Sequence, residues 1–226
     1  LYPGRVFREY MSLVGNEKWV CKNVFDIFPE IEQCRIAIEH VPDRSIVGRV
    51  EELAYLAIIT KTMSPKSIFE IGKYRGRTAL NFALNSPAEC QINTLDLPLT
   101  EADDAGSTKN FADSELFRKR NLGLNFLGKD VSHKITQLFG NSLEFDFTPF
   151  HNKVDLVFID GAHHYQAAKS DTENALKMIK TGGVIMWHDF ANYGDYNDVT
   201  RAILDCLPGN KVYQIENTEL AVYRHE

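Results

Sequence analysis

The sequence has few cysteines, and they lie far apart. Cys21, Cys34, Cys90 and Cys206 form no C-x-x-C pair, so the pattern indicates neither a zinc knuckle nor a disulfide framework. Reduced and mostly buried thiols are typical of a cytosolic protein. We therefore expect a cytoplasmic location.

A surplus of positive charge is also missing. The chain has 25 Lys and Arg against 31 Asp and Glu, a formal net charge of −6, and lacks the basic stripe that phosphate backbones or anionic lipids select. We expect neither nucleic acid nor a membrane as a partner. No apolar run approaches the roughly 20 residues that span a bilayer. No secretory signal is visible, but the chain begins at Leu1 and not at methionine, so its start says little about targeting.

What the sequence does contain is an alternation of short β-rich runs and longer helical stretches after Gly48. With 226 residues, 44% of them apolar, one core is the default, and the alternation is typical of βαβ units. We predict an α/β fold with a Rossmann-like, doubly wound, seven-stranded and mostly parallel sheet that has one antiparallel strand near the C-terminus. The expected strands are Ser67–Ile71, Gln91–Asp96, Lys134–Phe139, Val154–Asp160, Gly183–His188, Lys211–Ile215 and Leu220–Arg224.

Helices are predicted between the strands and ahead of them. Gly76–Leu84 and Tyr165–Ile179 have helical periodicity, and the second should end at Thr181-Gly182-Gly183, where glycine can adopt the left-handed conformation. Residues 1–50 should form a helical layer of the same domain, which covers a site or packs against a second copy in a homo-oligomer, while residues 51–226 hold the sheet. The helices expected in and next to this layer are Val6–Val14, Ile31–His40 and Arg49–Lys61.

A glycine turn follows the first of these strands, in the spacing Glu70-x-Gly72-x-x-x-Gly76. Ligands of parallel sheets bind at the carboxyl ends of the strands, where glycines let the backbone approach them. A plain tight turn would have the same glycines. However, an acid at residue 70 would repel a pyrophosphate and suits a ligand that has a cationic amino group and no phosphate.

Two further polar positions favour a nucleoside ligand. Asp96 ends the next strand, where a carboxylate can accept both ribose hydroxyls, and Asn141 and Ser142 follow the third strand, where they can meet the edge of an adenine ring. A loop cap at Asp96 and an ordinary turn at residues 140–142 would give the same residues. Together these positions describe a ligand with adenine, ribose and an amino-acid part, which S-adenosylmethionine fits.

Two neighbouring strands each deliver an acid to the same edge of the sheet. Asp160 follows one buried strand and Asp189 the next, and two close carboxylates repel each other unless a cation or a proton lies between them. Oxygen ligands favour Mg²⁺ or a similar divalent ion. His163, expected in the first turn of a helix whose positive end keeps the imidazole neutral, is the candidate general base. His164 is the rival candidate, and a purely structural role for both histidines is the third interpretation.

The stretch from Glu70 to Thr78, EIGKYRGRT, resembles the cofactor motif of catechol-type enzymes. The chain is identified as a member of the class I methyltransferases, similar to small-molecule O-methyltransferases of the catechol and macrolide-sugar types over about residues 45–226. By this resemblance Tyr74 lies near the cofactor and Thr78 meets its carboxylate. Metal-dependent relatives place a Lys or His base three positions after the metal-binding Asp, which supports His163.

The sequence departs from the catechol-type pattern after the second acid. That family has an Asn or Asp ligand there, whereas this chain has Phe190, which offers no oxygen to a cation. The third ligand would be His188, Asn192 or Glu144, or the site runs without metal and uses His163 and Asp189 as an acid/base pair. The segment 190–199 either lines the acceptor pocket through its aromatic and polar side chains or is a solvated turn.

We therefore expect an S-adenosylmethionine-dependent methyltransferase that acts on a hydroxyl of a small molecule, such as a sugar, phenol or polyketide-like compound. Two other functions stay open: a nicotinamide-dependent oxidoreductase, against which Glu70 argues, and a catalytically silent module that binds the cofactor or a partner. In the enzyme, Asp160, His163 and Asp189 would carry the chemistry.

Overall fold

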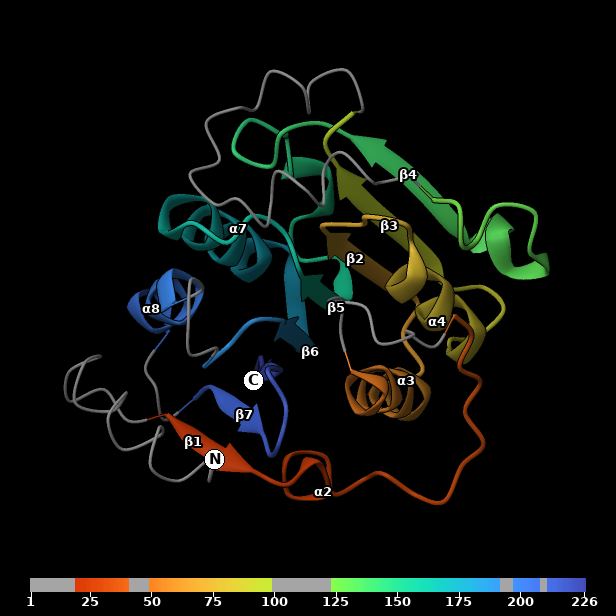
Figure 1. Ribbon diagram of the computed structural model, residues 1–226, viewed down its shortest axis with the longest axis horizontal. Helices are drawn as coiled ribbons and strands as arrows, with labels where there is room; N and C mark the ends of the chain where they lie inside the picture. Colours follow the sequence, from red (N-terminus) through yellow and green to blue (C-terminus); the bar gives the residue numbers. More distant parts are fainter. Residues whose placement is uncertain (1–18, 41–48, 99–122, 192–196, 208–210) are drawn as a thin grey trace.

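The computed structural model of the protein describes residues 19–40, 49–98, 123–191, 197–207 and 211–226, which build a central sheet with helices on both faces (Figure 1). The sheet has eight strands in the order β1-β7-β8-β6-β5-β2-β3-β4. The strands are β1 (Val20–Lys22), β2 (Ser67–Ile71), β3 (Gln91–Asp96), β4 (Ile135–Phe139), β5 (Val154–Ile159), β6 (Ile179–Trp187), β7 (Tyr213–Ile215) and β8 (Ala221–Arg224).

The pairing of these strands confirms the predicted Rossmann-like architecture. β8 pairs antiparallel with both of its neighbours, β6 and β7, whereas every other pair of the described strands is parallel. The eighth strand, β1, was not predicted, because it has only three residues and pairs only with β7. The order of the strands reverses between β2 and β5, the position at which open α/β sheets bind their ligands.

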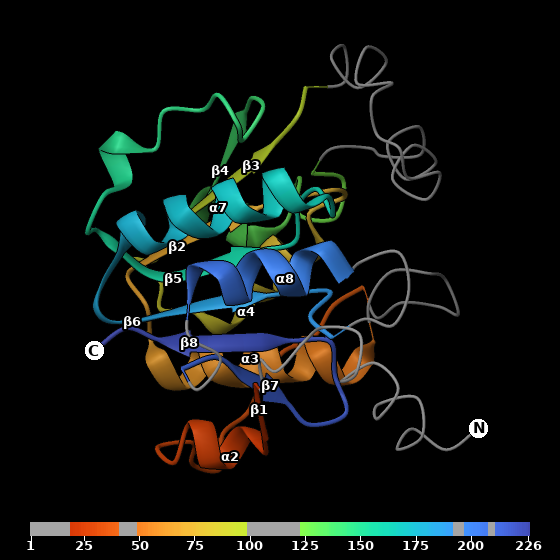
Figure 2. The same ribbon diagram turned by 90° about the vertical axis from the view of Figure 1, so that its left-hand side faces the viewer.

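Helices α3 and α4 cover one face of the sheet, and α7 and α8 cover the other (Figures 1 and 2). The described helices are α2 (Val24–Ile27), α3 (Val50–Met63), α4 (Arg77–Asn85), α7 (Tyr165–Met178) and α8 (Asn197–Cys206), with 3₁₀ turns at Asp130–Lys134 and Thr148–Phe150. The helix predicted at Arg49–Lys61 is confirmed as α3, and the one predicted at Gly76–Leu84 as α4. The predicted Val6–Val14 helix lies outside the described residues.

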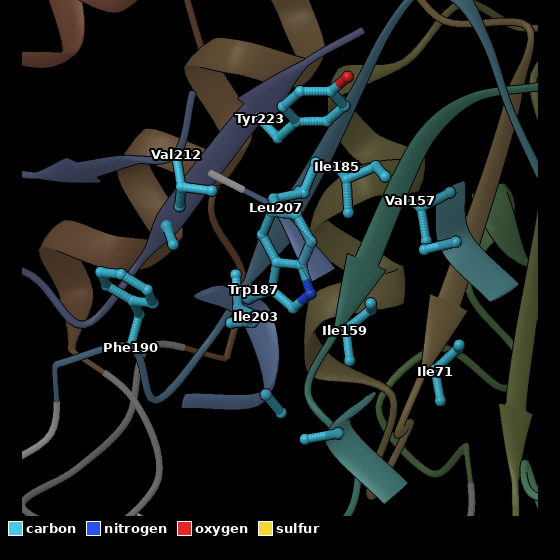
Figure 3. Packing of buried hydrophobic residues seen from close by; sticks show 14 of the residues in the cluster. Ile71, Val157, Ile159, Ile185, Trp187, Phe190, Ile203, Leu207, Val212 and Tyr223 are labelled. Carbon is cyan, nitrogen blue, oxygen red and sulfur yellow. The ribbon is translucent and has the colours of Figure 1, made fainter. Parts of the chain in front are cut away.

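Alternate residues of the central strands serve the two faces. Val157 and Ile159 of β5 belong to the core under α7 and α8 (Figure 3), whereas Leu156 and Phe158 pack with residues of α3 and α4. A strand buried on both faces is apolar almost throughout, because the side chains that point to either face of the sheet are buried. Burying each large apolar side chain contributes about 1.5–3 kcal/mol, so the middle of the sheet is the most strongly held part of the site's frame.

The segment predicted as a helix at Ile31–His40 has no regular secondary structure, so that prediction is wrong. Two asparagines of α4 hold its backbone. Asn85 accepts from the Ala37 N–H at 2.9 Å and donates to the Ala37 carbonyl at 2.8 Å. Asn81 pairs with both backbone groups of Glu39 at 3.0 Å. These bonds replace the intrahelical ones, so local helical preference loses to a tertiary partner.

The predicted end of the second inter-strand helix is also wrong. Helix α7 ends at Met178, and β6 begins at Ile179. Gly182 does have a positive φ of 79°, but within β6, beside a register shift against β5. Its left-handed conformation therefore serves an irregular strand and not a helix end. The predicted loop at 190–199 is corrected as well, because α8 begins at Asn197.

Candidate functional site

The turns that follow β2 and β5 lie against each other at the point where the strand order reverses. The Asp160 N–H donates to the Ile71 carbonyl at 2.8 Å, and Gly72 has a φ of +91°. A Cβ atom at Gly72 would lie 1.9 Å from the Asp160 carbonyl oxygen. Glycine is therefore required here, because no side chain fits between the two turns.

Glu70 lies inside the sheet directly before this turn and is only 1% exposed. One carboxyl oxygen, Oε2, accepts a short hydrogen bond from the Thr94 hydroxyl on β3, while the buried Oε1 has no hydrogen-bond partner. Burial raises the pKa of Glu70 to about 8, and the nearby Asp160 adds to the rise. A buried carboxyl oxygen without a donor fits a ligand that brings a cationic amino group to it.

Asp96 at the end of β3 holds the glycine turn. Its Oδ2 accepts from the Tyr74 N–H and its Oδ1 from the Leu97 N–H, both at 2.8 Å. Tyr74 has a φ of +50°, which is uncommon for a residue with a side chain and which these bonds stabilise. The loop-capping interpretation of Asp96 is thus present in the structure, since both carboxylate oxygens accept from backbone N–H groups.

The turn passes into α4 at Gly76, which caps the helix with a φ of +79°. A Cβ atom at Gly76 would lie 2.3 Å from the Phe126 ring, so this glycine serves close packing. Thr78 is half-buried in the first turn of α4, where backbone N–H groups and the helix dipole favour an anion such as a carboxylate.

Asn141 and Ser142 follow β4 at the same edge of the sheet. The Gly140 N–H donates to the Asp96 carbonyl at 3.0 Å, which links this turn to the end of β3. Asn141 Oδ1 accepts from the Leu143 N–H at 3.1 Å, and Asn141 lines an open hollow with Phe145 and others. Both residues lie in the turn that follows β4, the strand paired with the one that Asp96 ends.

The three residues predicted to carry the chemistry are close together. His163 Nε2 lies 2.8 Å from Asp189 Oδ2, and Asp160, His163 and Asp189 each offer one ligand atom within 4.8 Å of the others. All three line a cavity of about 10 Å³, which is the size of one water molecule or ion. Asp189 has a φ of +57°, and such strain in a non-glycine residue is typical of functional sites.

His188 adds a second imidazole to this cluster. Its Nδ1 lies 3.2 Å from Asp189 Oδ2 and 3.6 Å from Asp160 Oδ1. Its Nε2 lies 3.2 Å from Oε2 of Glu52 on α3. Burial opposes a charge on His188, but the three surrounding carboxylates outweigh it and raise its pKa well above the usual range.

The two central carboxyls have opposite pKa shifts. Burial opposes ionisation of Asp189, but hydrogen bonds from His163 and His188 prevail and hold its pKa far below the usual range. Burial raises the pKa of Asp160, and the charge of Asp189 adds to this. The structure thus pairs an Asp189 whose ionised form is favoured with an Asp160 whose ionisation burial and Asp189 oppose, and the neighbouring His188 acts in the other direction on Asp160.

Histidines 163 and 164 have different positions. His164 caps α7, and its Nδ1 accepts from the Ala167 N–H at 3.3 Å, so its role is structural. His163 precedes the cap and is not in the first turn of the helix, which corrects that prediction. The dipole of α7 still ends beside it, and its partner is the carboxylate of Asp189.

Phe190 lies in the hydrophobic core under α7 and α8. It is fully buried, and its ring meets Trp19 edge-on at 5.3 Å between centroids, as the position of Phe190 in the core shows (Figure 3). Phe190 therefore belongs to the core, while residues 192–196 of the segment proposed to line an acceptor pocket lie outside the described residues. Among the alternatives for a third ligand, Glu144 lines the hollow beside Asn141, Asn192 lies outside the described residues, and His188 contacts both acids.

Sequence reasoning missed Glu52. It is 3% exposed and lies one turn before Leu56 on the buried face of α3. The local signal that could have identified Glu52 is its place in the apolar stripe of the helix. Acids are almost never buried without a partner, so an acid in such a stripe indicates one.

Comparison with known proteins assigns a family to the segment that contains most of the site residues. Residues 69–190 match a family model described as "Methyltransferase domain". An Arabidopsis thaliana protein provisionally assigned as a caffeoyl-CoA O-methyltransferase is 28% identical over 151 residues, which cover 64% of this chain and 55% of that protein. The chain thus spans about half the length of the curated relatives it matches.

Solved structures support the fold at low identity. The O-methyltransferase TomG of Streptomyces achromogenes, solved in complex with S-adenosylmethionine, matches with a TM-score of 0.54 and 15% identity over 80% of this chain and 82% of that one. The Podospora anserina methyltransferase PaMTH1 matches with 0.55 and 14% over 100% and 97% of the two chains. In the described part of the chain, no helix is long and apolar enough to cross a membrane.

Proposed function

The chain belongs to the methyltransferase-domain family, and from this premise we propose that it transfers the methyl group of S-adenosylmethionine to a hydroxyl oxygen of a small molecule. The observation that carries the proposal is the juxtaposition of two features in the matched region. The Asp160, His163 and Asp189 cluster adjoins the glycine turn after Glu70, since the Asp160 carbonyl packs against Gly72. The proposed general base and the proposed cofactor turn therefore lie at the same edge of the sheet.

The cofactor would lie across the carboxyl ends of β2, β3 and β4. Its amino group would meet the unpaired Oε1 of Glu70, and its carboxylate the first turn of α4 at Thr78. Tyr74 would flank the methionine part. Its ribose hydroxyls would meet Asp96, and its adenine ring Asn141 and Ser142. When bound, S-adenosylmethionine supplies an electrophilic methyl group on a positively charged sulfur.

His163 is proposed as the general base. With Nε2–H donated to Asp189 at 2.8 Å, Nδ1 is the atom that would take the acceptor's hydroxyl proton while the oxygen forms its bond to the methyl carbon and the bond between that carbon and the cofactor's sulfur breaks. The Asp189 carboxylate orients the ring and stabilises the imidazolium that results. The proton leaves the site when His163 returns it to water.

Asp160 and Asp189 also fit a divalent ion such as Mg²⁺. Their oxygens are the hard ligands that such ions prefer, and the ligand atoms are already close together. An ion held there would supply a Lewis acid that lowers the pKa of the acceptor hydroxyl. Chelation with EDTA should therefore abolish activity, and added divalent ion should restore it; unchanged rates would remove the ion from the proposal.

The test of the reaction is transfer of a labelled methyl group from S-adenosylmethionine to a panel of phenols, sugars and polyketide-like alcohols. His163→Ala should lose turnover and keep cofactor affinity. His164→Asn, which can still cap α7, is the matched control. Equilibrium dialysis against NAD tests the oxidoreductase, which Glu70 disfavours because a buried acid would repel a pyrophosphate. A silent binding module would show cofactor binding without transfer to any acceptor.

A further inference from the structure

Glu52 is a buried acid that reaches the site from α3, 136 residues before its partner His188. Its Oε1 accepts from the Glu219 N–H at 2.9 Å. Its Oε2 accepts from the Arg49 N–H at 3.0 Å and faces His188 Nε2 at 3.2 Å. The first two bonds are structural, since they close a capping box and fix the turn between β7 and β8. The third bond joins Glu52 to a side chain that also contacts Asp160 and Asp189.

The hydrogen bond to Glu52 fixes which ring nitrogen of His188 faces the cluster. A carboxylate accepts only from a protonated nitrogen, so Nε2 carries an N–H toward Glu52, while Nδ1 faces Asp160 and Asp189 at 3.6 and 3.2 Å. Without an ion Nδ1 also carries an N–H, which it donates to Asp189; a divalent ion between the acids would displace that proton and leave Nδ1 as a ligand, while Glu52 keeps the proton on Nε2. In metal sites, a carboxylate on the far nitrogen of a ligating imidazole sets its tautomer and orientation in this way.

The surroundings hold the turn of His188 from both sides. The His188 N–H donates to the Ile159 carbonyl at 3.0 Å, and the next turn is fixed where the Phe190 N–H donates to the Glu219 carbonyl at 2.9 Å. Glu219 is also bonded to Glu52, so α3, the turn before β8 and the cluster form one connected unit.

We propose that Glu52 is a positioning residue that turns Nδ1 of His188 toward Asp160 and Asp189, so that His188 completes the donor set which Phe190 leaves incomplete. The inference rests on the divalent ion of the proposed function. A nitrogen beside two carboxylate oxygens also changes the preferred ion, because imidazole suits transition metals better than Mg²⁺. We therefore expect Mn²⁺ to bind more tightly than Mg²⁺.

The test is Mn²⁺ affinity of the full chain without cofactor, measured from the loss of the free-ion electron paramagnetic resonance signal. Glu52→Gln should weaken Mn²⁺ binding by about 10- to 100-fold. Glu51→Gln removes the same charge from an exposed neighbour in α3 and should leave the affinity unchanged. Glu52→Asp keeps the charge but is too short to reach His188, so it should weaken binding too and serves if Glu52→Gln fails to fold.

A merely structural role for Glu52 is separated by a double-mutant cycle. In a His188→Ala background, Glu52→Gln should have no further effect on Mn²⁺ affinity, because its partner is gone. An equal loss in both backgrounds, or a Glu52→Gln variant that binds like Glu51→Gln, overturns the positioning role and leaves the metal site standing. Absence of Mn²⁺ binding by the unchanged protein, with methyl transfer intact, overturns both the metal and this inference.

Discussion

Replacing Glu70 by glutamine should change how stability depends on pH. In the folded protein burial raises the pKa of Glu70 from its usual 4.5 to about 8, so the folded state holds a proton that the unfolded state has released. An acid whose pKa is higher in the folded than in the unfolded state contributes less to stability as the pH rises, so the contribution of Glu70 falls between pH 4.5 and 8. Between pH 5 and 7 the loss is about 2.5 kcal/mol, at 1.36 kcal/mol for each pKa unit.

Glu70→Gln cannot ionise, so this loss should be absent. Its amide can still accept from Thr94, and its NH₂ group takes the place of the unpaired oxygen, at a cost that does not vary with pH. The difference in unfolding free energy between variant and parent should therefore move by about 2.5 kcal/mol in the variant's favour from pH 5 to 7. Urea denaturation of both proteins without cofactor, at closely spaced pH values, measures it.

A second buried acid gives an internal comparison. Asp171 of α7 is fully buried, and burial raises its pKa from 3.8 to about 7, so Asp171→Asn should show the same trend in a lower pH window. A Glu70→Gln difference that stays flat across pH 5 to 7 would refute the reasoning, because it would mean that Glu70 is already ionised in the folded protein.

Three further predictions concern single side chains. His163→Ala should lower kcat by about 100- to 10,000-fold with little change in cofactor affinity, and a matching loss of affinity in calorimetry would argue against a base. Gly72→Ala should cost more than about 4 kcal/mol, because its Cβ meets the Asp160 carbonyl at 1.9 Å; a normal melting temperature would contradict this. Asn81→Ala should leave Glu39 without its two backbone bonds and make residues 37–40 susceptible to limited proteolysis, which an unchanged digestion pattern would disprove.

The central strands could be predicted because their local pattern and their environment agree. A run such as Val154–Ile159 is apolar throughout, and in the fold it is buried on both faces, so burial alone specifies it. The residues that end these strands, Asp96 and Asp160 among them, could be placed at one edge because parallel strands share their carboxyl ends. This part of the site follows from topology.

The remaining errors have a common physical cause, which is a partner far along the chain. β1 is too short for a local signal and depends on β7 for its pairing. The segment at 31–40 is not helical, and Asn81 and Asn85 bind its backbone at Glu39 and Ala37. Glu52 fits a helix-start pattern locally, and only the fold brings it to His188. Period and propensity describe a segment's own preferences and contain no information on such contacts.

Asp160 links the two halves of the site. Its carbonyl oxygen occupies the space beside Gly72, and its carboxyl group helps to raise the pKa of Glu70. A positive charge that neutralises Asp160 therefore makes Glu70 easier to ionise, which is the state that an amino group at Oε1 requires. His188 and Asp189 surround Asp160 on the other side, so a change of charge at either residue would act on Asp160 and, through it, on Glu70. The Asp160 cluster and the glycine turn after Glu70 are thus linked through electrostatics as well as through packing.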